Sequence, residues 1–353
     1  MDHEHTTGME QVYLAVECKD FDVLVIGNPC VDLIFSGLPH WPAPGKEVYA
    51  TRFAIGAGAV FNTAAALSRL GLRVALLGEL GNDCLSRYLL EEIRRAGICS
   101  DLVRQREQRI AALSVALVHD DERGFVSYVE RPSPSSPAAA PLSPSAASAG
   151  SASREEAPAP ATELLPPLSL PELRALLQRY RWRAVFLHLH PALGPALELF
   201  AEQRIEVFLD TGWHPRLLGD QRVPEVLRRC TVFLPNRLEA EALTGARDPE
   251  TAARQLAQLA PLVVIKLGAE GALACQGEQL WHCPAWPVSE VIDPTGAGDA
   301  FDAGFIYALL HGYSLPEALR CGTICGSLAT TALTGSAAVP DAAELERLRH
   351  STP

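Results

Sequence analysis

"VIDPTGAGDAFDAGFI", residues 291–306, places two aspartates around a run of very small side chains and then turns apolar. Backbone N–H groups at a helix N-terminus point outward, and the helix dipole favours negative charge there. Larger side chains would block the approach of a phosphate to these N–H groups. The stretch therefore predicts an anion hole built from the backbone of its small residues, which are Gly296, Ala297 and Gly298.

The aspartate that follows the small residues, Asp299, has two interpretations. In the simpler one, Gly and Ala permit a tight turn and Asp299 caps the helix that begins there. In the other, a carboxylate beside an anion hole takes a proton from an attacking hydroxyl, as phosphoryl transfer requires. The pattern by itself leaves both interpretations open.

The composition narrows the class of protein. The chain has 353 residues, 48% of them hydrophobic, and a formal net charge of −12. This acidity argues against nucleic acids and anionic membranes as main partners, although local backbone dipoles can still bind a phosphate. Residues 1–20 lack the order of a signal peptide, and no apolar run approaches the roughly 20 residues of a membrane span. Nine cysteines without a C-x-x-C pair indicate buried thiols, so we expect a cytoplasmic protein.

Strand and helix patterns alternate along the chain. The continuous apolar run 23–26 predicts a strand buried on both faces, as in a parallel sheet, and the alternation continues to residue 100 and again after 168. Strand-like runs around "HDDERG" predict a hairpin, which with the 45–55 segment would form a small separate sheet. We therefore predict an α/β, Rossmann-like fold: a mainly parallel sheet flanked by helices, with a small β-sheet lid.

Residues 132–168 differ in composition from the rest of the chain. Pro, Ser and Ala dominate and aromatic residues are absent. A segment of this kind cannot bury enough apolar surface to offset its ordering entropy. We expect a disordered insertion at a surface loop, with a docking motif as the alternative.

Several stretches together resemble the PfkB family of carbohydrate kinases, which has the ribokinase-like fold. "DPTGAGDAFDAGF" looks like the C-terminal signature of that family, and "GAGAVFNTAAALSRLG" is similar to its N-terminal signature. The resemblance runs from about 21 to 345, with the insertion inside it. Further matching stretches are "VIGNPCVD", "LPNRLEAEALTG", "VVIKLGAEGALA" and "GSAAVP". No Walker-type loop occurs, and "GAGAVFN" does not follow the first buried strand, so it is not a dinucleotide fingerprint.

The resemblance implies roles for the two aspartates of the opening stretch. Asp299 would be the general base that deprotonates the acceptor hydroxyl, and the three small residues before it would hold the charge on the transferred phosphoryl group. Asp293 would lie near a site for a monovalent cation such as K+. Its alternative role is to accept local N–H bonds within its own loop.

The resemblance also implies an acceptor site. Asp32, at the end of the first strand, would bind sugar hydroxyls, with Gly58 allowing close approach and Asn62 adding a hydrogen bond. Asn62 could equally be the N-cap of the following helix. His190, which shares a strand face with His188, would be a polar substrate contact or a structural histidine. Ala57 and Phe61 depart from the family pattern.

The resemblance also implies a nucleotide side, built from three further stretches. Asn236 and Glu239 would act near the phosphates and Mg2+, the glutamate through water, or else form a capping box. Lys266 would contact phosphate, unless it is a snorkelling surface lysine. Gly268 would lie at the end of the same strand, and Thr323 would line the adenine site.

We therefore expect ATP- and Mg2+-dependent phosphotransfer to a hydroxyl of a small sugar. A nucleoside kinase of the same fold is the alternative, because Trp41, Phe53 and Phe61 could stack a base. A catalytically silent sugar-binding regulator is the alternative from another class. We expect a kinase domain at 21–345 with lid segments at about 33–56 and 111–131, tails at 1–20 and 346–353, and leave open a homodimer through the lid.

Overall fold

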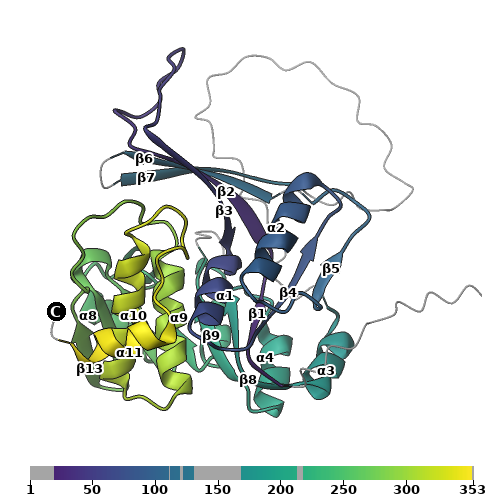
Figure 1. Ribbon diagram of the computed structural model, residues 1–353. Coiled ribbons are helices and arrows are strands. Elements are labelled where there is room, and N and C mark those ends of the chain that lie inside the picture. The colour runs from purple at the N-terminus through teal and green to yellow at the C-terminus, as the bar shows by residue number, and fades with distance from the viewer. Residues whose placement is uncertain (1–19, 111, 120–121, 131–167, 213–217, 352–353) are drawn as a thin grey trace, which may run out of the picture.

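The computed structural model describes residues 20–110, 112–119, 122–130, 168–212 and 218–351. Within them the chain forms a large mixed sheet between helices and a smaller sheet that projects from one end (Figure 1). The prediction of a mainly parallel α/β sheet flanked by helices, with a smaller separate sheet, is confirmed.

The main sheet has nine strands, and all of its pairs are parallel except the two that involve β12. In spatial order the strands are β13 (Gln279–Cys283), β12 (Ala272–Gln276), β11 (Val263–Lys266), β10 (Val232–Phe233), β9 (Glu206–Asp210), β8 (Arg181–His188), β1 (Asp20–Ile26), β4 (Val74–Leu80) and β5 (Val103–Gln105). Parallel strands place their carboxyl ends at one edge of the sheet, which is where ligands bind in open α/β folds.

Helices cover both faces of this sheet and make two separate cores. Strand β1 shows why its sequence is continuously apolar, because Val23 and Val25 enter one core while Leu24 and Ile26 enter the other. One face carries α1 (Val60–Arg69), α2 (Cys84–Arg95), α9 (Ala297–Leu310), α10 (Leu315–Ala329) and α11 (Ala342–His350). The other carries α3 (Leu170–Arg179), α4 (Gly194–Glu202), α6 (Val223–Leu227), α7 (Arg237–Thr244) and α8 (Pro249–Leu256).

The small sheet is the lid, with the strand order β3-β2-β6-β7. Its strands are β2 (Pro29–Ser36), β3 (Arg52–Ala59), β6 (Ala112–His119) and β7 (Glu122–Val129). Antiparallel pairing of β6 with β7 agrees with the predicted hairpin. Alternate residues face opposite sides, so the lid has an inner face that carries Asp32 and Arg123 and an outer face that carries Phe53 and Val126.

The chain passes from the main sheet to the lid at Gly27. Its φ of 148° is unfavourable for other residues, and a Cβ there would lie 2.7 Å from Val60 Cγ1. The prediction that Asp32 ends the first main-sheet strand is wrong, because that strand ends at Ile26 and Asp32 lies on lid strand β2. The lid accordingly begins at Pro29, before the expected boundary at 33.

The expected tails and insertion have different outcomes. The tail 1–20 and the insertion 132–168 lie outside the described residues except for Asp20 and Leu168, and Leu168 packs against the core. The C-terminal boundary is wrong, because α11 continues to His350 and is held by a buried Leu345. Among the described residues, no helix has the length and apolarity needed to cross a membrane.

Candidate active site

A cavity of about 940 Å³ lies between the inner face of the lid, the start of α9 and the carboxyl ends of β8, β9 and β11. It brings together most of the residues singled out in the sequence. Those that line it are Asn236, Glu239, Lys266, Gly268, Gly296, Ala297, Gly298, Asp299 and Thr323. His188 also lines the cavity. The other predicted site residues are not part of its lining: Asp32, Gly58, Asn62, His190 and Asp293. His190 accepts a hydrogen bond from Ala192 N at Nδ1.

The small residues before Asp299 serve conformation and packing as well as access. Gly296 is the N-cap of α9, with a φ of 75° that favours glycine. A Cβ on Gly296 would lie 2.3 Å from Cα of Gly335 in the C-terminal loop. The next residues are therefore the first of the helix, where N–H groups have no partner within the helix. One of them is partly engaged, since Ala297 N–H donates to Pro294 O at 3.3 Å.

Asp293 ties this loop to the rest of the site. It is fully buried, and its Oδ1 accepts a hydrogen bond from Thr295 N at 2.9 Å. Its Oδ2 accepts one from Thr334 N, 3.4 Å away in the C-terminal loop. The structure thus shows the local N–H bonds of the alternative role.

Asp299 is the third residue of α9 and points towards α1. Its Oδ1 accepts a hydrogen bond from Thr63 Oγ1 at 3.1 Å, and its Oδ2 accepts one from Asn62 Nδ2 at 3.4 Å. The interpretation of Asp299 as the helix cap is wrong, because Gly296 occupies that position. Burial, followed by the charge of Asp210, raises the pKa of Asp299 from 3.8 to about 7. A carboxylate with such a pKa is suited to general-base work near neutral pH.

Asp32 and Gly58 form one unit on the lid. Burial and the charge of Asp293 raise the pKa of Asp32 to about 6, although the thiol of Cys30 donates to its Oδ1 at 3.4 Å and opposes the shift. A Cβ on Gly58 would lie 1.9 Å from Asp32 Oδ2. Glycine is therefore required here by the aspartate itself.

Asn62 lies inside α1 rather than at its start. The N-cap of α1 is Ala59, so the interpretation of Asn62 as a cap is wrong. While its Nδ2 donates to Asp299, its buried Oδ1 has no hydrogen-bond partner among the described residues. A buried acceptor without a partner is costly, and this one belongs to the amide that contacts Asp299.

Lys266 is held by carboxylates. Its Nζ lies 3.0 Å from Asp210 Oδ2 and 2.9 Å from Asp302 Oδ2, and its side chain is only 11% exposed. The alternative of a snorkelling surface lysine is therefore wrong. Burial disfavours the charged ammonium, but the charges of Asp210 and Asp302 outweigh it and raise the pKa of Lys266. A Cβ on Gly298 would lie 3.6 Å from this Nζ, so the ammonium borders the predicted anion hole.

Asn236 and Glu239 form the capping box that the sequence allowed. Asn236 Oδ1 accepts from Glu239 N at 3.0 Å, and Glu239 Oε2 accepts from Asn236 N at 2.7 Å. Burial and the charge of Asp210 raise the pKa of Glu239. Glu239 and Asp210 both line the cavity and repel each other when ionised. Carboxylate oxygens of this kind are ligands that fit Mg2+.

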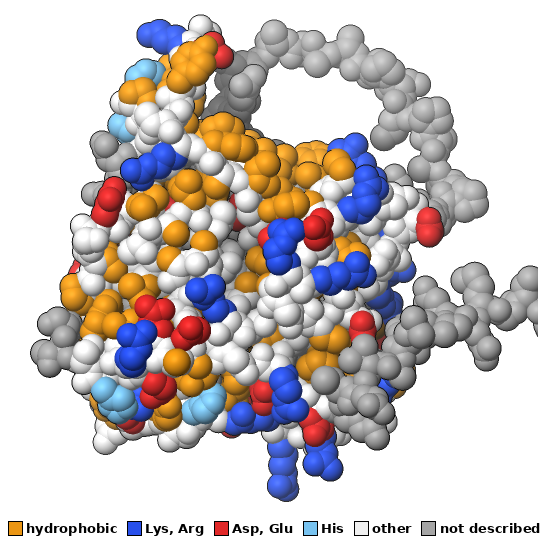
Figure 2. Space-filling model, in the orientation of Figure 1, with side chains coloured by type: hydrophobic (Ala, Val, Ile, Leu, Met, Phe, Trp, Pro, Cys, Tyr) orange, Lys and Arg blue, Asp and Glu red, His pale blue; other side chains and the backbone are white. Residues whose placement is uncertain are grey.

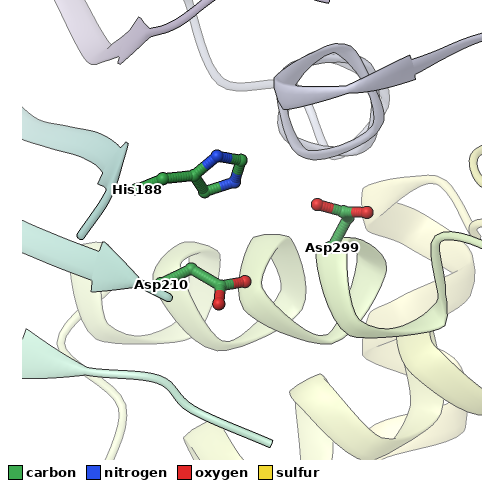
Figure 3. Close-up of side chains that lie close together, drawn as sticks. All are labelled: His188, Asp210 and Asp299. Atoms are coloured by element: carbon green, nitrogen blue, oxygen red, sulfur yellow. The ribbon is translucent and has the colours of Figure 1, made fainter. Parts of the chain in front are cut away.

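His188, Asp210 and Asp299 point towards one another from β8, β9 and α9 (Figure 3). Their ligand atoms all lie within 4.8 Å of one another, so this trio could hold a metal ion. In the sequence, no carboxylate lies near His188 and His190 that could complete a metal site. The fold brings Asp210 and Asp299 next to His188. Both carboxylates already accept bonds from protein donors, and Lys266 neutralises one of them.

Four site residues were not singled out in the sequence: Thr63, Arg123, Asp210 and Asp302. Two of them have a visible signal. Asp210 ends a buried strand, and Asp302 is a charge three residues after Asp299 in an otherwise apolar helix, on the same helical face. Thr63 and Arg123 stand in an alanine-rich helix and a hairpin and have no such signal. Conversely, Trp41, Phe53 and Phe61 do not line the cavity.

The sequence is similar to several kinases. A family profile described as "pfkB family carbohydrate kinase" matches residues 20–148 and 192–342. An uncharacterised sugar kinase of Archaeoglobus fulgidus is 30% identical over 265 residues, which cover 72% of this chain and 90% of the relative. 5-Dehydro-2-deoxygluconokinase of Shouchella clausii is 26% identical, covering 94% of this chain and 96% of the relative. 2-Dehydro-3-deoxygluconokinase of Bacillus subtilis is 27% identical, covering 77% and 79%.

Solved structures of low identity share the fold. Arabidopsis thaliana ribokinase, complexed with ribose and ATP, has a TM-score of 0.70 at 20% identity and covers 94% of this chain and 100% of its own. A protein from E. coli assigned as ribokinase II, in complex with ATP and Mg2+, has a TM-score of 0.69 at 17% identity and covers 93% and 98%. Because the profile matches most of the chain and the opening motif lies at a cavity of the expected kind, the chain belongs to the pfkB family of carbohydrate kinases.

Proposed function

We propose that this kinase transfers the γ-phosphoryl group of ATP to a hydroxyl of a small sugar, with Asp299 as the general base. The main observation behind this proposal is the position and pKa of Asp299. Its carboxylate, with a pKa raised to about 7, lies in the first turn of a helix whose N-terminus lines the cavity. A base, an electropositive helix end and room for a ligand are the parts that phosphoryl transfer needs.

The acceptor would be held from the lid side. Asp32 would accept hydrogen bonds from acceptor hydroxyls, and the unpartnered Oδ1 of Asn62 would accept another. Asp299 then takes the proton of the attacking hydroxyl. At the same time the hydroxyl oxygen of the acceptor bonds to phosphorus, and the bond between phosphorus and the leaving ADP breaks. The N–H groups of Gly296, Ala297 and Gly298 stabilise the charge on the transferred group.

ATP is the substrate of the family, and this chain has suitable groups on the nucleotide side. Asn236, Lys266 and Gly268 would lie along the phosphates, and Thr323 would line the adenine site. Glu239 would hold Mg2+ through water, and the ion would neutralise phosphate charge. A monovalent cation near Asp293 remains part of the proposal, tested by comparing activity in K+ and in tetramethylammonium salts.

A sugar is favoured over a nucleoside as the acceptor. The aromatic residues that could have stacked a base lie elsewhere: Phe61 is buried in the core, and Phe53 lies on the outer face of the lid. Intact Asp299 and an intact small-residue run argue against a silent regulator. Two relatives are named as kinases of dehydrodeoxygluconates, so sugar acids belong in the substrate panel.

We also propose that the lid forms a homodimer. Four side chains on its outer face are more than half exposed, and Figure 2 shows hydrophobic side chains gathered at this end of the molecule. They are Phe53, Ile55, Val126 and Tyr128, and a contiguous exposed apolar face of this kind marks an interaction site. Val126→Asp should reduce the mass measured by light scattering to that of a monomer, whereas Leu170→Asp, an exposed site elsewhere, should not.

ADP formation tests the main proposal. The protein with ATP and Mg2+ is assayed against a panel of neutral sugars, sugar acids and nucleosides, with Asp299→Asn as the control. We expect turnover with at least one sugar or sugar acid and almost none with the variant. Turnover of nucleosides alone, or equal rates for both proteins, would contradict the proposal.

A further inference from the structure

The lid touches the loop before α9 from three of its strands, and one contact brings a cation into the cavity. The contacts pair Arg52 with Glu290, Ser36 with the carbonyl of Ile292, and Arg123 with the carbonyl of Pro294. Of the three lid residues, only Arg123 lines the cavity. It stands on β7, on the inner face of the lid, opposite Val118 of β6.

The bond to Pro294 positions Arg123 without cancelling its charge. Nη1 donates to the carbonyl oxygen at 2.6 Å, and a carbonyl is a neutral acceptor. A guanidinium has five N–H donors, so this bond leaves a fork for a second acceptor. Burial lowers the pKa of Arg123, and the charges of Asp293 and Asp299 oppose that shift. The guanidinium of Arg123, an exposed residue of the lid, therefore lies close enough to Asp293 and Asp299 to feel their charges.

The two basic side chains that line the cavity, Lys266 and Arg123, meet different residues of the stretch around the base. Lys266 borders Gly298 on the nucleotide side and is neutralised by Asp210 and Asp302. Arg123 reaches in from the lid and meets the other end of the small-residue run, at Pro294. Arg123 shares the inner face of the lid with Asp32, the proposed acceptor contact, and we therefore assign it to the acceptor side as part of the same proposal.

We propose that Arg123 binds a carboxylate of the acceptor, so that the substrate is a sugar acid. This rests on the proposed kinase function and narrows its substrate class. A negatively charged acceptor would be repelled by Asp293 and Asp299, and the charge of the Arg123 guanidinium near them offsets that repulsion. The planar fork of arginine suits a carboxylate, which it can bind through two parallel N–H bonds.

The test compares matched acid and neutral acceptors in Arg123→Ala and Arg123→Lys. The acids are 2-dehydro-3-deoxygluconate and gluconate, and the neutral acceptors are glucose and fructose. Hydrogen bonds to charged groups are worth about 1.5–3 kcal/mol, so Arg123→Ala should lower kcat/KM for the acid substrate about ten- to a hundredfold. Neutral acceptors should change less than about threefold, and Arg123→Lys should fall between, because a lysine is a point charge.

Two controls separate this role from others. Arg52→Ala removes a lid arginine that contacts the same loop but lies outside the cavity lining, and should leave the preference for acids unchanged. Titration calorimetry with the acid and no nucleotide should show weaker binding by Arg123→Ala, independently of turnover.

Several outcomes would overturn the proposal. An equal fall in kcat for acid and neutral acceptors would place Arg123 on the phosphoryl group, and loss of the preference in Arg52→Ala would make it a general lid effect. Undiminished binding of the acid by Arg123→Ala would also overturn it. By contrast, a wild-type protein that binds the acid through Arg123 but turns over no acceptor contradicts the kinase function alone.

Discussion

Asp299→Asn should make the protein more stable at alkaline pH while it greatly slows catalysis. Burial and the charge of Asp210 disfavour the ionised form of Asp299 and outweigh the opposing effects of its other neighbours, so the folded protein bears a cost when Asp299 loses its proton. Asparagine keeps the size of the side chain and removes that cost. The buried Oδ1 of Asn62 lacks a partner in the wild type. After the Asn62 amide flips, this oxygen could accept a hydrogen bond from the amide introduced at position 299.

The magnitude follows from the pKa shift. The pKa rises from 3.8 in the unfolded chain to about 7 in the folded protein. Stability from this group is therefore fully present below pH 3.8 and is lost as the pH rises through 7. Each pKa unit corresponds to about 1.36 kcal/mol, so the wild type should lose about 2–3 kcal/mol between pH 5 and pH 8 that the variant keeps.

Urea unfolding of both proteins at pH 5 and pH 8 measures this difference, because groups common to both cancel. Glu278→Gln, which removes a carboxylate that is 99% exposed, is the matched control and should show no pH-dependent gain in stability.

Turnover of Asp299→Asn should fall by about a hundred- to ten-thousandfold. In the wild type, kcat/KM should decline below about pH 7 as the base becomes protonated. A constant stability difference between the two pH values would refute the raised pKa, and near-normal turnover would refute the base.

Three further predictions concern other parts of the molecule. Asp32→Ala should strongly raise the KM for the acceptor and leave the KM for ATP nearly unchanged. Gly58→Ala should do the same, because the added Cβ would displace the Asp32 carboxylate. Equal changes in the two KM values would contradict this prediction. Lys266→Met leaves buried carboxylates unpaired and should cost about 3–5 kcal/mol in urea unfolding, whereas a loss below about 1 kcal/mol would show that they become neutral instead. Deletion of 132–167 with a short Gly/Ser bridge should leave solubility and kcat/KM nearly intact, as its composition predicts.

The features that could be predicted from the sequence are those fixed by local chemistry. The small residues before Asp299 specify a turn and a helix start within a few positions, and the apolar run of β1 specifies a strand between two cores. The capping box of Asn236 and Glu239 is likewise local. These features need no knowledge of distant neighbours.

What could not be predicted depends on tertiary contacts. Apolar residues occur on both sides of Gly27, and they do not reveal that β1 and β2 belong to different sheets. The partners of Lys266 come from β9 and α9, 56 and 36 residues away. Arg123 lies in a hairpin that carries no recognisable motif, and it donates to a carbonyl 171 residues away in the sequence.

The opening stretch carries two functions at once because of its helical spacing. Asp299 and Asp302 are three residues apart and lie on one face of α9. The first meets Thr63 and Asn62 of α1, and the second holds Lys266. The helix dipole and Lys266 favour an ionised Asp299, whereas burial and the charge of Asp210 disfavour it. Since the opposing effects leave the pKa near neutrality, loss of the Lys266 charge should raise it and move the acid limb of kcat/KM to higher pH.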